Sequence, residues 1–165
     1  MKLLRAIKNK KGNALSLSKG FTLIELLVVI GILAVLLAIT LIAINPARQF
    51  SQANNTKRRS DVSAMLNAVN QYMADNKGAV PTGITTTTQN ISSTGANICA
   101  ALVSQYIAAL PSDPKAANGG VSITDCGVAY DTGYAVVQNA TVSSRITVSV
   151  LTANQELGEA ISATR

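Results

Sequence analysis

One stretch of the sequence constrains the fold more than any other, because residues 26–44 contain no charged side chain. As an α-helix these 19 residues would span about 28 Å at 1.5 Å per residue, close to the ~30 Å hydrocarbon core of a bilayer. Pro46 ends the run, since it cannot donate a hydrogen bond to the carbonyl of Ile42 and disfavours helical geometry at Asn45. The pattern predicts a transmembrane helix over residues 21–45, with a kink or break near Pro46.

A single carboxylate, Glu25, lies at the start of this run. A charged group at the middle of a bilayer costs about 2.5–3.5 kcal/mol on insertion scales, and residues of this kind usually have a function. Glu25 therefore needs either a partner or a role.

Basic residues are concentrated ahead of the apolar run. Residues 1–20 contain six of the 14 basic residues and none of the eight acidic ones, so the remainder of the chain is neutral. Basic residues beside a membrane helix stay in the cytoplasm, which predicts a single pass through the inner membrane with the C-terminus outside. The run is too long for an ordinary secretory signal, and no Ala-x-Ala site follows it. Topology alone leaves open both a cleaved leader over residues 1–20 and an anchor that is never cleaved.

A second helical pattern follows Pro46. Apolar side chains recur at helical spacing between polar ones, and Gly78 and Pro81 follow where the helix should end. The apolar positions are Val62, Met65, Leu66, Val69, Tyr72 and Met73. We expect one long helix over residues 23–76, bent near Pro46, whose continuation over residues 46–77 is amphipathic.

Residues 78–165 are predicted to form a globular head of loops and short strands. Residues 81–97 are rich in Thr, Ser, Asn and Gly and indicate a loop, and residues 98–110 indicate a short amphipathic helix. The later patterns predict consecutive strands, and hence a small antiparallel sheet whose apolar face covers the helix. The predicted strands are 121–124, 127–130, 134–138, 146–151 and 159–164, with a turn at 131–133. The expected fold class is therefore α+β.

The head also contains both cysteines of the chain, Cys99 and Cys126. An exported position favours a disulfide between them, and two buried free thiols are the alternative. Their spacing is far from Cys-x-x-Cys, which argues against a redox pair.

The sequence offers little for catalysis or cofactor binding. It contains no histidine, which removes the commonest general base and a common zinc ligand. It has neither a phosphate-binding Gly-Lys loop nor a dinucleotide-binding glycine pattern. Asp113, Asp125 and Asp131 could form a calcium site, but their setting is more typical of turns. We expect no enzyme activity, no metal and no cofactor.

Lys57-Arg58-Arg59 is the one basic cluster after residue 20. At 100° per residue it spreads around a helix, which indicates a solvated or subunit-contacting patch rather than one face for DNA or an acidic surface. Asn54, Asn90 and Asn139 each begin an Asn-x-Ser/Thr triplet, a weak glycosylation signal.

The segment Lys19-Gly20-Phe21-Thr22-Leu23-Ile24-Glu25, with a basic leader before it and an apolar run after it, resembles the processing motif of type IV prepilins. The resemblance covers residues 1 to about 76, and the head is similar to pilins only in architecture and length. It implies that prepilin peptidase, a membrane aspartic peptidase, cleaves between Gly20 and Phe21, and that Phe21 is then N-methylated. The mature protein would wait in the inner membrane and then join identical subunits in an extracellular filament through the pilus assembly platform.

The resemblance also gives Glu25 a role. Cleavage frees the amino group of Phe21, four residues before Glu25 on one helix. In a filament core their attraction is largely offset by desolvation, so the pair is predicted to set the register of assembly while apolar burial supplies the cohesion. Gly31 and Pro46 are predicted to let the helix melt locally on assembly, and ordinary tolerance of Gly and Pro in membrane helices is the alternative.

The expected function is a structural subunit, a major pilin, of a type IV pilus that serves adhesion, twitching motility or DNA uptake. A pseudopilin of a type II secretion system or a minor pilin is the alternative, since both share the leader and anchor. The absence of an acidic calcium loop near the C-terminus favours a pilin, and Glu25 favours a major subunit. A membrane-anchored module that binds a host surface or DNA is less well supported, and an anchored enzyme least of all.

Overall fold

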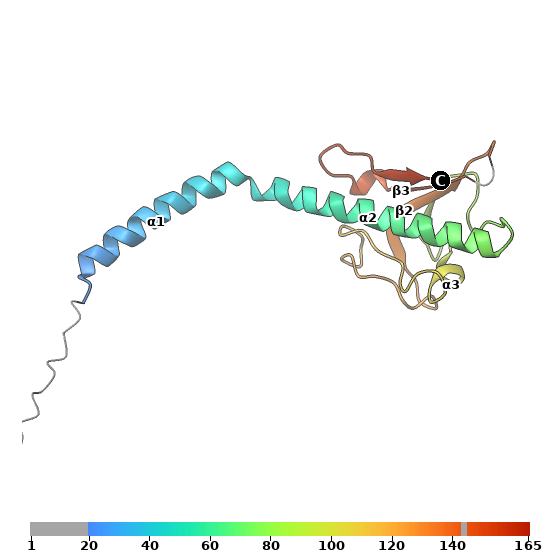
Figure 1. Ribbon diagram of the computed structural model, residues 1–165, viewed down its shortest axis with the longest axis horizontal. Coiled ribbons are helices and arrows are strands. Elements are labelled where there is room, and N and C mark those ends of the chain that lie inside the picture. Colours follow the sequence, from blue (N-terminus) through green and yellow to red (C-terminus); the bar gives the residue numbers. More distant parts are fainter. Residues whose placement is uncertain (1–19, 143–144) are drawn as a thin grey trace, which may run out of the picture. The chain divides into compact units, whose positions relative to one another are not determined.

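The computed structural model describes residues 20–142 and 145–165 of the chain (Figure 1). Helix α1 (Leu23–Ile44) and helix α2 (Pro46–Asp75) come first, and a four-stranded antiparallel sheet follows them. This arrangement confirms the predicted α+β class. Except for Gly20, the predicted leader lies outside the described residues.

The chain divides into two compact units, Met1–Ile44 and Asn45–Arg165. In the first unit, α1 has 22 residues, none of them buried, and would extend about 33 Å at 1.5 Å per residue. Within the described ranges, no other helix is long and apolar enough to cross a membrane. A helix that is apolar on every side needs lipid or other helices around it.

The predicted break near Pro46 is confirmed, but it separates two helices rather than bending one. Asn45 has a left-handed backbone with φ 47°, and its side-chain oxygen accepts the N–H of Arg48 at 3.3 Å. Pro46 is the first residue of α2, where its missing N–H removes no helical hydrogen bond and its fixed φ suits the helix. Asn45-Pro46 thus acts as a helix start signal.

The other end of α2 is closed by two residues with left-handed backbones, Lys77 (φ 55°) and Gly78 (φ 85°). The N–H of Gly78 donates to the carbonyl of Met73 at 2.7 Å, the six-to-one bond of a Schellman motif. The sequence located this end well, although Lys77, not glycine, directly follows the capping residue Asn76.

The sheet has the strand order β1-β2-β3-β4, and each strand pairs antiparallel with the next. Its strands are β1 (Gln89–Ser92), β2 (Asp131–Gln138), β3 (Ile146–Val150) and β4 (Ser162–Thr164). The predicted consecutive antiparallel topology is therefore right.

Several predicted element positions are wrong. Residues 81–97, predicted as a loop, contain β1, and the predicted turn at 131–133 is the start of β2. Polar β1 forms because Ile91 is fully buried and Asn90 pairs with Ala135.

The predicted strands at 121–124 and 127–130 are not strands. Ile123 makes only an isolated antiparallel bridge with Leu110. The predicted helix over 98–110 is reduced to the single turn α3 (Cys99–Leu102).

The core lies between α2 and the sheet, as the amphipathic pattern predicts. The α2 side chains Val62, Met65 and Val69 are at most 1% exposed, and α2 contacts both β3 and β4. Full burial of a side chain of this size contributes about 1.5–3 kcal/mol. The buried partners from the sheet include Tyr134, Val136, Ile146, Val148 and Val150.

The predicted disulfide is present between Cys99 and Cys126, whose Cα atoms are 5.5 Å apart. It joins α3 to a long segment in which the described residues form only short bridges and turns. The disulfide therefore restrains this segment, which has no regular strand to hold it in place.

Candidate processing and assembly site

The start of α1 is closed by a reciprocal pair of hydrogen bonds between Thr22 and Glu25. The Thr22 N–H and hydroxyl both donate to Oε2 of Glu25 at 2.7 Å. The Glu25 N–H donates to the hydroxyl oxygen of Thr22 at 3.2 Å. This is a capping box, in which Thr and Glu three residues apart satisfy the free N–H groups of a helix start.

The capping box was missed at the sequence level, although Thr-x-x-Glu before an apolar run is its usual signature. In the uncleaved chain the nitrogen of Phe21 is part of a peptide bond, so Glu25 bonds to Thr22 instead. The predicted contact between Glu25 and the amino group of Phe21 therefore belongs to the mature protein and stays a prediction.

The peptide bond between Gly20 and Phe21 is accessible. Phe21 is 83% exposed, and apart from the two neighbouring residues no atom lies within 4 Å of the position that a Cβ of residue 20 would occupy. Both residues precede the first helical residue. Exposed, irregular backbone of this kind suits a protease.

The two predicted flexibility residues have different surroundings. Gly31 is helical and exposed within α1. Apart from the backbone of its own helix and its two neighbours, nothing lies within 4 Å of the position that a Cβ of residue 31 would occupy. Pro46 begins α2. Only Pro46 coincides with an interruption of the helix, and local melting at either position remains a prediction.

The model of the prokaryotic N-terminal methylation motif matches residues 15–41 of the chain. The chain is a type IV prepilin-like protein. The match includes Gly20, Phe21, the capping box and most of α1, and none of the head. The motif implies processing by prepilin peptidase and assembly into a pilus-like polymer. No curated protein and no solved structure matched the chain in the other two comparisons.

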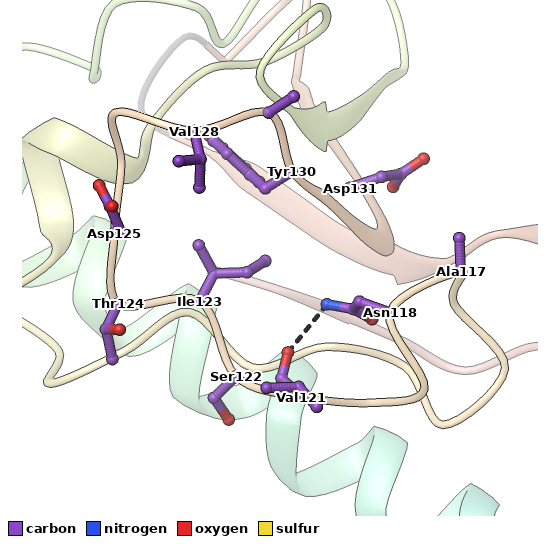
Figure 2. Close-up of a pocket in the computed structure, with 11 residues that line it drawn as sticks. Ala117, Asn118, Val121, Ser122, Ile123, Thr124, Asp125, Val128, Tyr130 and Asp131 are labelled. Carbon is purple, nitrogen blue, oxygen red and sulfur yellow. Dashed lines mark hydrogen bonds between the residues drawn. The ribbon is translucent and has the colours of Figure 1, made fainter.

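The head of this prepilin-like chain has an apolar hollow of about 650 Å³ between residues 117 and 131 (Figure 2). Ile123, Val128 and Tyr130 point into it, while Asp125 and Asp131 lie on opposite sides of its rim. Among the lining residues drawn, the side-chain hydrogen bond runs from Asn118 to the carbonyl of Val121 at 2.9 Å. An apolar floor with a charged rim is typical of a contact surface.

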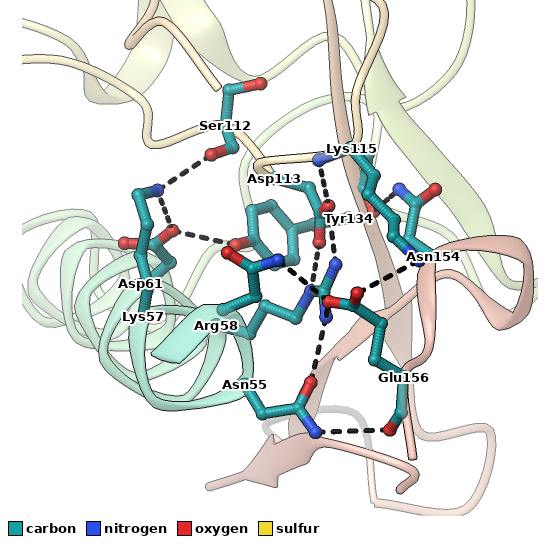
Figure 3. A network of polar contacts seen from close by, with 12 residues as sticks. Asn55, Lys57, Arg58, Asp61, Ser112, Asp113, Lys115, Tyr134, Asn154 and Glu156 are labelled. Carbon is teal, nitrogen blue, oxygen red and sulfur yellow. Dashed lines mark hydrogen bonds and ion pairs between the residues drawn. The ribbon is translucent and has the colours of Figure 1, made fainter. Parts of the chain in front are cut away.

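On α2, the head carries an ionic network centred on Arg58 (Figure 3). Arg58 is 0% exposed and donates from Nε and Nη2 to the two carboxylate oxygens of Asp113 at 2.7 and 3.1 Å. Its Nη1 donates to Glu156 at 2.6 Å and to Asn55 at 2.8 Å. The network joins α2 to the 111–116 turn and to the segment after β3.

At Arg58 this finding corrects the prediction that Lys57-Arg58-Arg59 is a solvated or subunit-contacting patch, whereas Lys57 and Arg59 remain partly exposed. Lys57 pairs with Asp61 at 2.6 Å, Arg58 is buried, and Arg59 pairs with Glu159. The error arose because 100° spacing shows that neighbours diverge around a helix but does not show which of them faces the core.

Two acid–base properties of the network follow from its geometry. Partial burial acts to raise the pKa of Glu156, but hydrogen bonds from Asn54, Arg58 and Lys115 outweigh burial and lower this pKa to about 2. Burial raises the pKa of Tyr134, and so does its hydrogen bond to the carboxylate of Asp61 at 2.7 Å.

The three aspartates considered for calcium have turn-type roles. Asp113, Asp125 and Asp131 each accept the backbone N–H two residues further on, at 2.7, 2.8 and 2.9 Å, which is the bond of an Asx-turn. Asp113 is also occupied by Arg58. Among residues 20–142 and 145–165, no group of three His, Cys, Asp or Glu is arranged to hold a metal.

Proposed function

We propose that this chain is a structural subunit, and specifically a major pilin, of a type IV pilus. The observation that carries the proposal is the methylation motif joined to α1, a helix that is apolar and uncovered on every side. The basic leader supports a precursor with residues 1–20 in the cytoplasm and the head outside the inner membrane. After processing, the same apolar surface would serve first as membrane anchor and then as filament core.

The capping box suggests how Glu25 is accommodated before assembly. The carboxylate already accepts two hydrogen bonds from Thr22, which reduces the penalty of placing it at the membrane boundary. Cleavage between Gly20 and Phe21 then creates an ammonium group one helical turn away. Opposite charges 4 Å apart attract by about 4 kcal/mol at an effective dielectric constant of 20.

Desolvation offsets much of that attraction, so the ion pair contributes little net cohesion. A subunit in the wrong register would leave the Glu25 charge unpaired in an apolar core, which is costly. Glu25 thus sets the register, and burial of α1 against copies of itself supplies the stability. Gly31 and Pro46 would provide points where the helix opens as it leaves the bilayer.

Mass spectrometry of filaments sheared from cells tests this proposal. We expect the dominant species to begin with N-methylated Phe21. Gly20→Val should block cleavage without disturbing the fold, because nothing lies within 4 Å of the Gly20 position. Gly31→Val is the matched control, since Gly31 is equally open, and it should still be cleaved.

Intact chains that retain residues 1–20 in the envelope would contradict the proposal. A cleaved chain with no surface filament, together with loss of protein export from the cell when the gene is deleted, would instead indicate a pseudopilin of a secretion system.

A further inference from the structure

Leu157 has the most unusual combination of backbone and side chain in the head. Its φ is 57°, in the left-handed region that glycine and asparagine favour and a bulky side chain avoids. The side chain is nevertheless 53% exposed, so it gains little from packing within its own chain. Strained residues of this kind persist when the surrounding structure holds them, and they cluster at functional positions.

The strain at Leu157 is held from both sides. Glu156, just before it, binds Arg58 at 2.6 Å and Asn54 at 3.0 Å. Glu159, two residues later, binds Asn55 at 3.0 Å and pairs with Arg59. These contacts with α2 therefore fix a short loop whose tip presents an apolar side chain to solvent.

The Leu157 side chain and the apolar hollow lie on different faces of the head, although an ion pair between Lys115 and Glu156 at 3.1 Å joins the segments that carry them. Figure 1 shows the loop before β4 and the segment around residues 103–130 on opposite sides of α2. The positions of α2 residues agree with this view. Three of them lie near Leu157, namely Gln52, Thr56 and Arg59. Lys57 instead donates to the carbonyl of Ser112, whose hydroxyl bonds to Asn118 of the hollow. At 100° per residue, these two sets of α2 residues point in directions that differ by about 150° around the helix axis. The first set is Gln52, Thr56 and Arg59, and the second is Lys57 and Asp61.

The charges on the two sides are complementary. Arg59 lies beside Leu157 and is half exposed. Within the part of the chain that the structure describes, it uses one nitrogen for Glu159, which leaves other donors of its guanidinium for a partner. Asp125 and Asp131 on the rim of the hollow are exposed and, within the described residues, form no ion pair.

We propose that Leu157 of one copy docks in the hollow between Val121 and Val128 of a second copy, with Arg59 facing the carboxylates on the rim. The inference rests on the proposed function, because it assigns the head contact of the same polymer. A contact between two different patches is heterologous, and when its rotation does not close it produces an open helical filament. The strained leucine is thus a knob that the head builds for its neighbour.

Cross-linking within intact filaments tests this contact. One strain would carry two versions of the full chain, Leu157→Cys and Val121→Cys, with the native disulfide intact, and filaments would be treated with a short bis-maleimide. We expect a covalent dimer that neither version gives alone. Val142→Cys in place of Val121→Cys is the control, since Val142 is also an exposed valine of the head. Equal cross-linking with Val142→Cys would overturn the contact.

A second variant separates assembly from folding. Leu157→Gly removes the knob and relieves the left-handed strain, so the head should unfold at the same or higher denaturant concentration. We expect at least a tenfold loss of filaments that survive shearing, whereas Val142→Ala should resemble the parent chain. Normal filaments from Leu157→Gly would refute the proposed docking of Leu157. That result would also be expected if the hollow binds a small apolar ligand instead of a second copy. Failure of the parent chain to be cleaved or to form any filament would count against the proposed function itself.

Discussion

Glu25 and Arg58 are both charged side chains of the two N-terminal helices, but the chain provides them with different partners. Arg58 has its partners Asp113, Glu156 and Asn55 within its own head and no exposed surface. Among the described residues, Glu25 has only the Thr22 capping bonds, on a helix with no buried residue. We therefore expect Arg58, which is satisfied within one chain, to stabilise the fold, and Glu25, which is not, to serve assembly.

The largest expected effect concerns the ionic network centred on Arg58, in which the buried charges have partners within the chain. Arg58→Ala should lower the free energy of unfolding of the head by about 3–5 kcal/mol, because it leaves Asp113 buried without its partner. Chemical denaturation of the full chain in detergent micelles, followed by near-UV circular dichroism of the head tyrosines, measures this. Arg59→Ala is the matched control and should cost less than about 1 kcal/mol, since its pair is exposed. An Arg58→Ala head as stable as that of Arg59→Ala would break the comparison.

The incomplete charge should show the reverse behaviour. Glu25→Ala should leave the free energy of unfolding of the head unchanged but reduce filament yield at least tenfold, equivalent to about 1.4 kcal/mol of assembly free energy. Immunoblots of membrane and sheared fractions give both pools. A filament yield from Glu25→Ala equal to that of the parent chain would contradict the proposed role of Glu25 in setting the register of assembly.

Acid should weaken the complete network in a defined window. Because the pKa of Glu156 is about 2 in the folded head and about 4.3 in an unfolded chain, its contribution is full above about pH 5. It is lost as the pH falls toward 2, and about 2 kcal/mol should disappear between pH 6 and pH 3.

Other carboxylates titrate in the same range, so the measured quantity is the difference from Glu156→Gln. The acid loss of stability should be smaller in Glu156→Gln than in the parent, as followed by urea unfolding at both pH values. Identical pH dependence in the two proteins would show that Glu156 does not couple to the fold.

The smallest expected effect concerns the capping box between Thr22 and Glu25 at the start of α1. Thr22→Val removes the capping hydroxyl and should cost about 1 kcal/mol of helix stability at the start of α1. Hydrogen exchange of the first-turn amides in micelles should be faster by several-fold, while exchange in α2 stays unchanged. Thr22→Ser is the control, because serine keeps the hydroxyl. Equal protection in Thr22→Val and the parent would show that the box does not hold the helix start.

Elements set by local chemistry were predictable. The uncharged run, Asn45-Pro46 and Gly78 mark helix ends through backbone constraints that act within a few residues, and the stripe from Val62 to Met73 identified the buried face of α2. The disulfide between Cys99 and Cys126 was also predictable, since the chain has no other cysteine.

Elements that depend on distant partners were not predictable. Strand β1 is polar and forms because β2 pairs with it, and residues 121–124 have strand composition but no full partner strand. Arg58 looked like its exposed neighbours because Asp113 and Glu156 lie 55 and 98 residues away. Leu157 gave no signal, since a left-handed leucine depends on the contacts of Glu156 and Glu159.

The sequence by itself determined that this chain is prepilin-like, with an apolar helix, one carboxylate at its start and a processing motif before it, because each of these is a property of consecutive residues. Only the tertiary structure decided which charges are buried, where the hollow lies and that Leu157 is displayed. Those properties arise from side chains brought together by the packing of α2 against the sheet and loops. Burial and pairing are relations between distant residues, so they exist only in the folded chain.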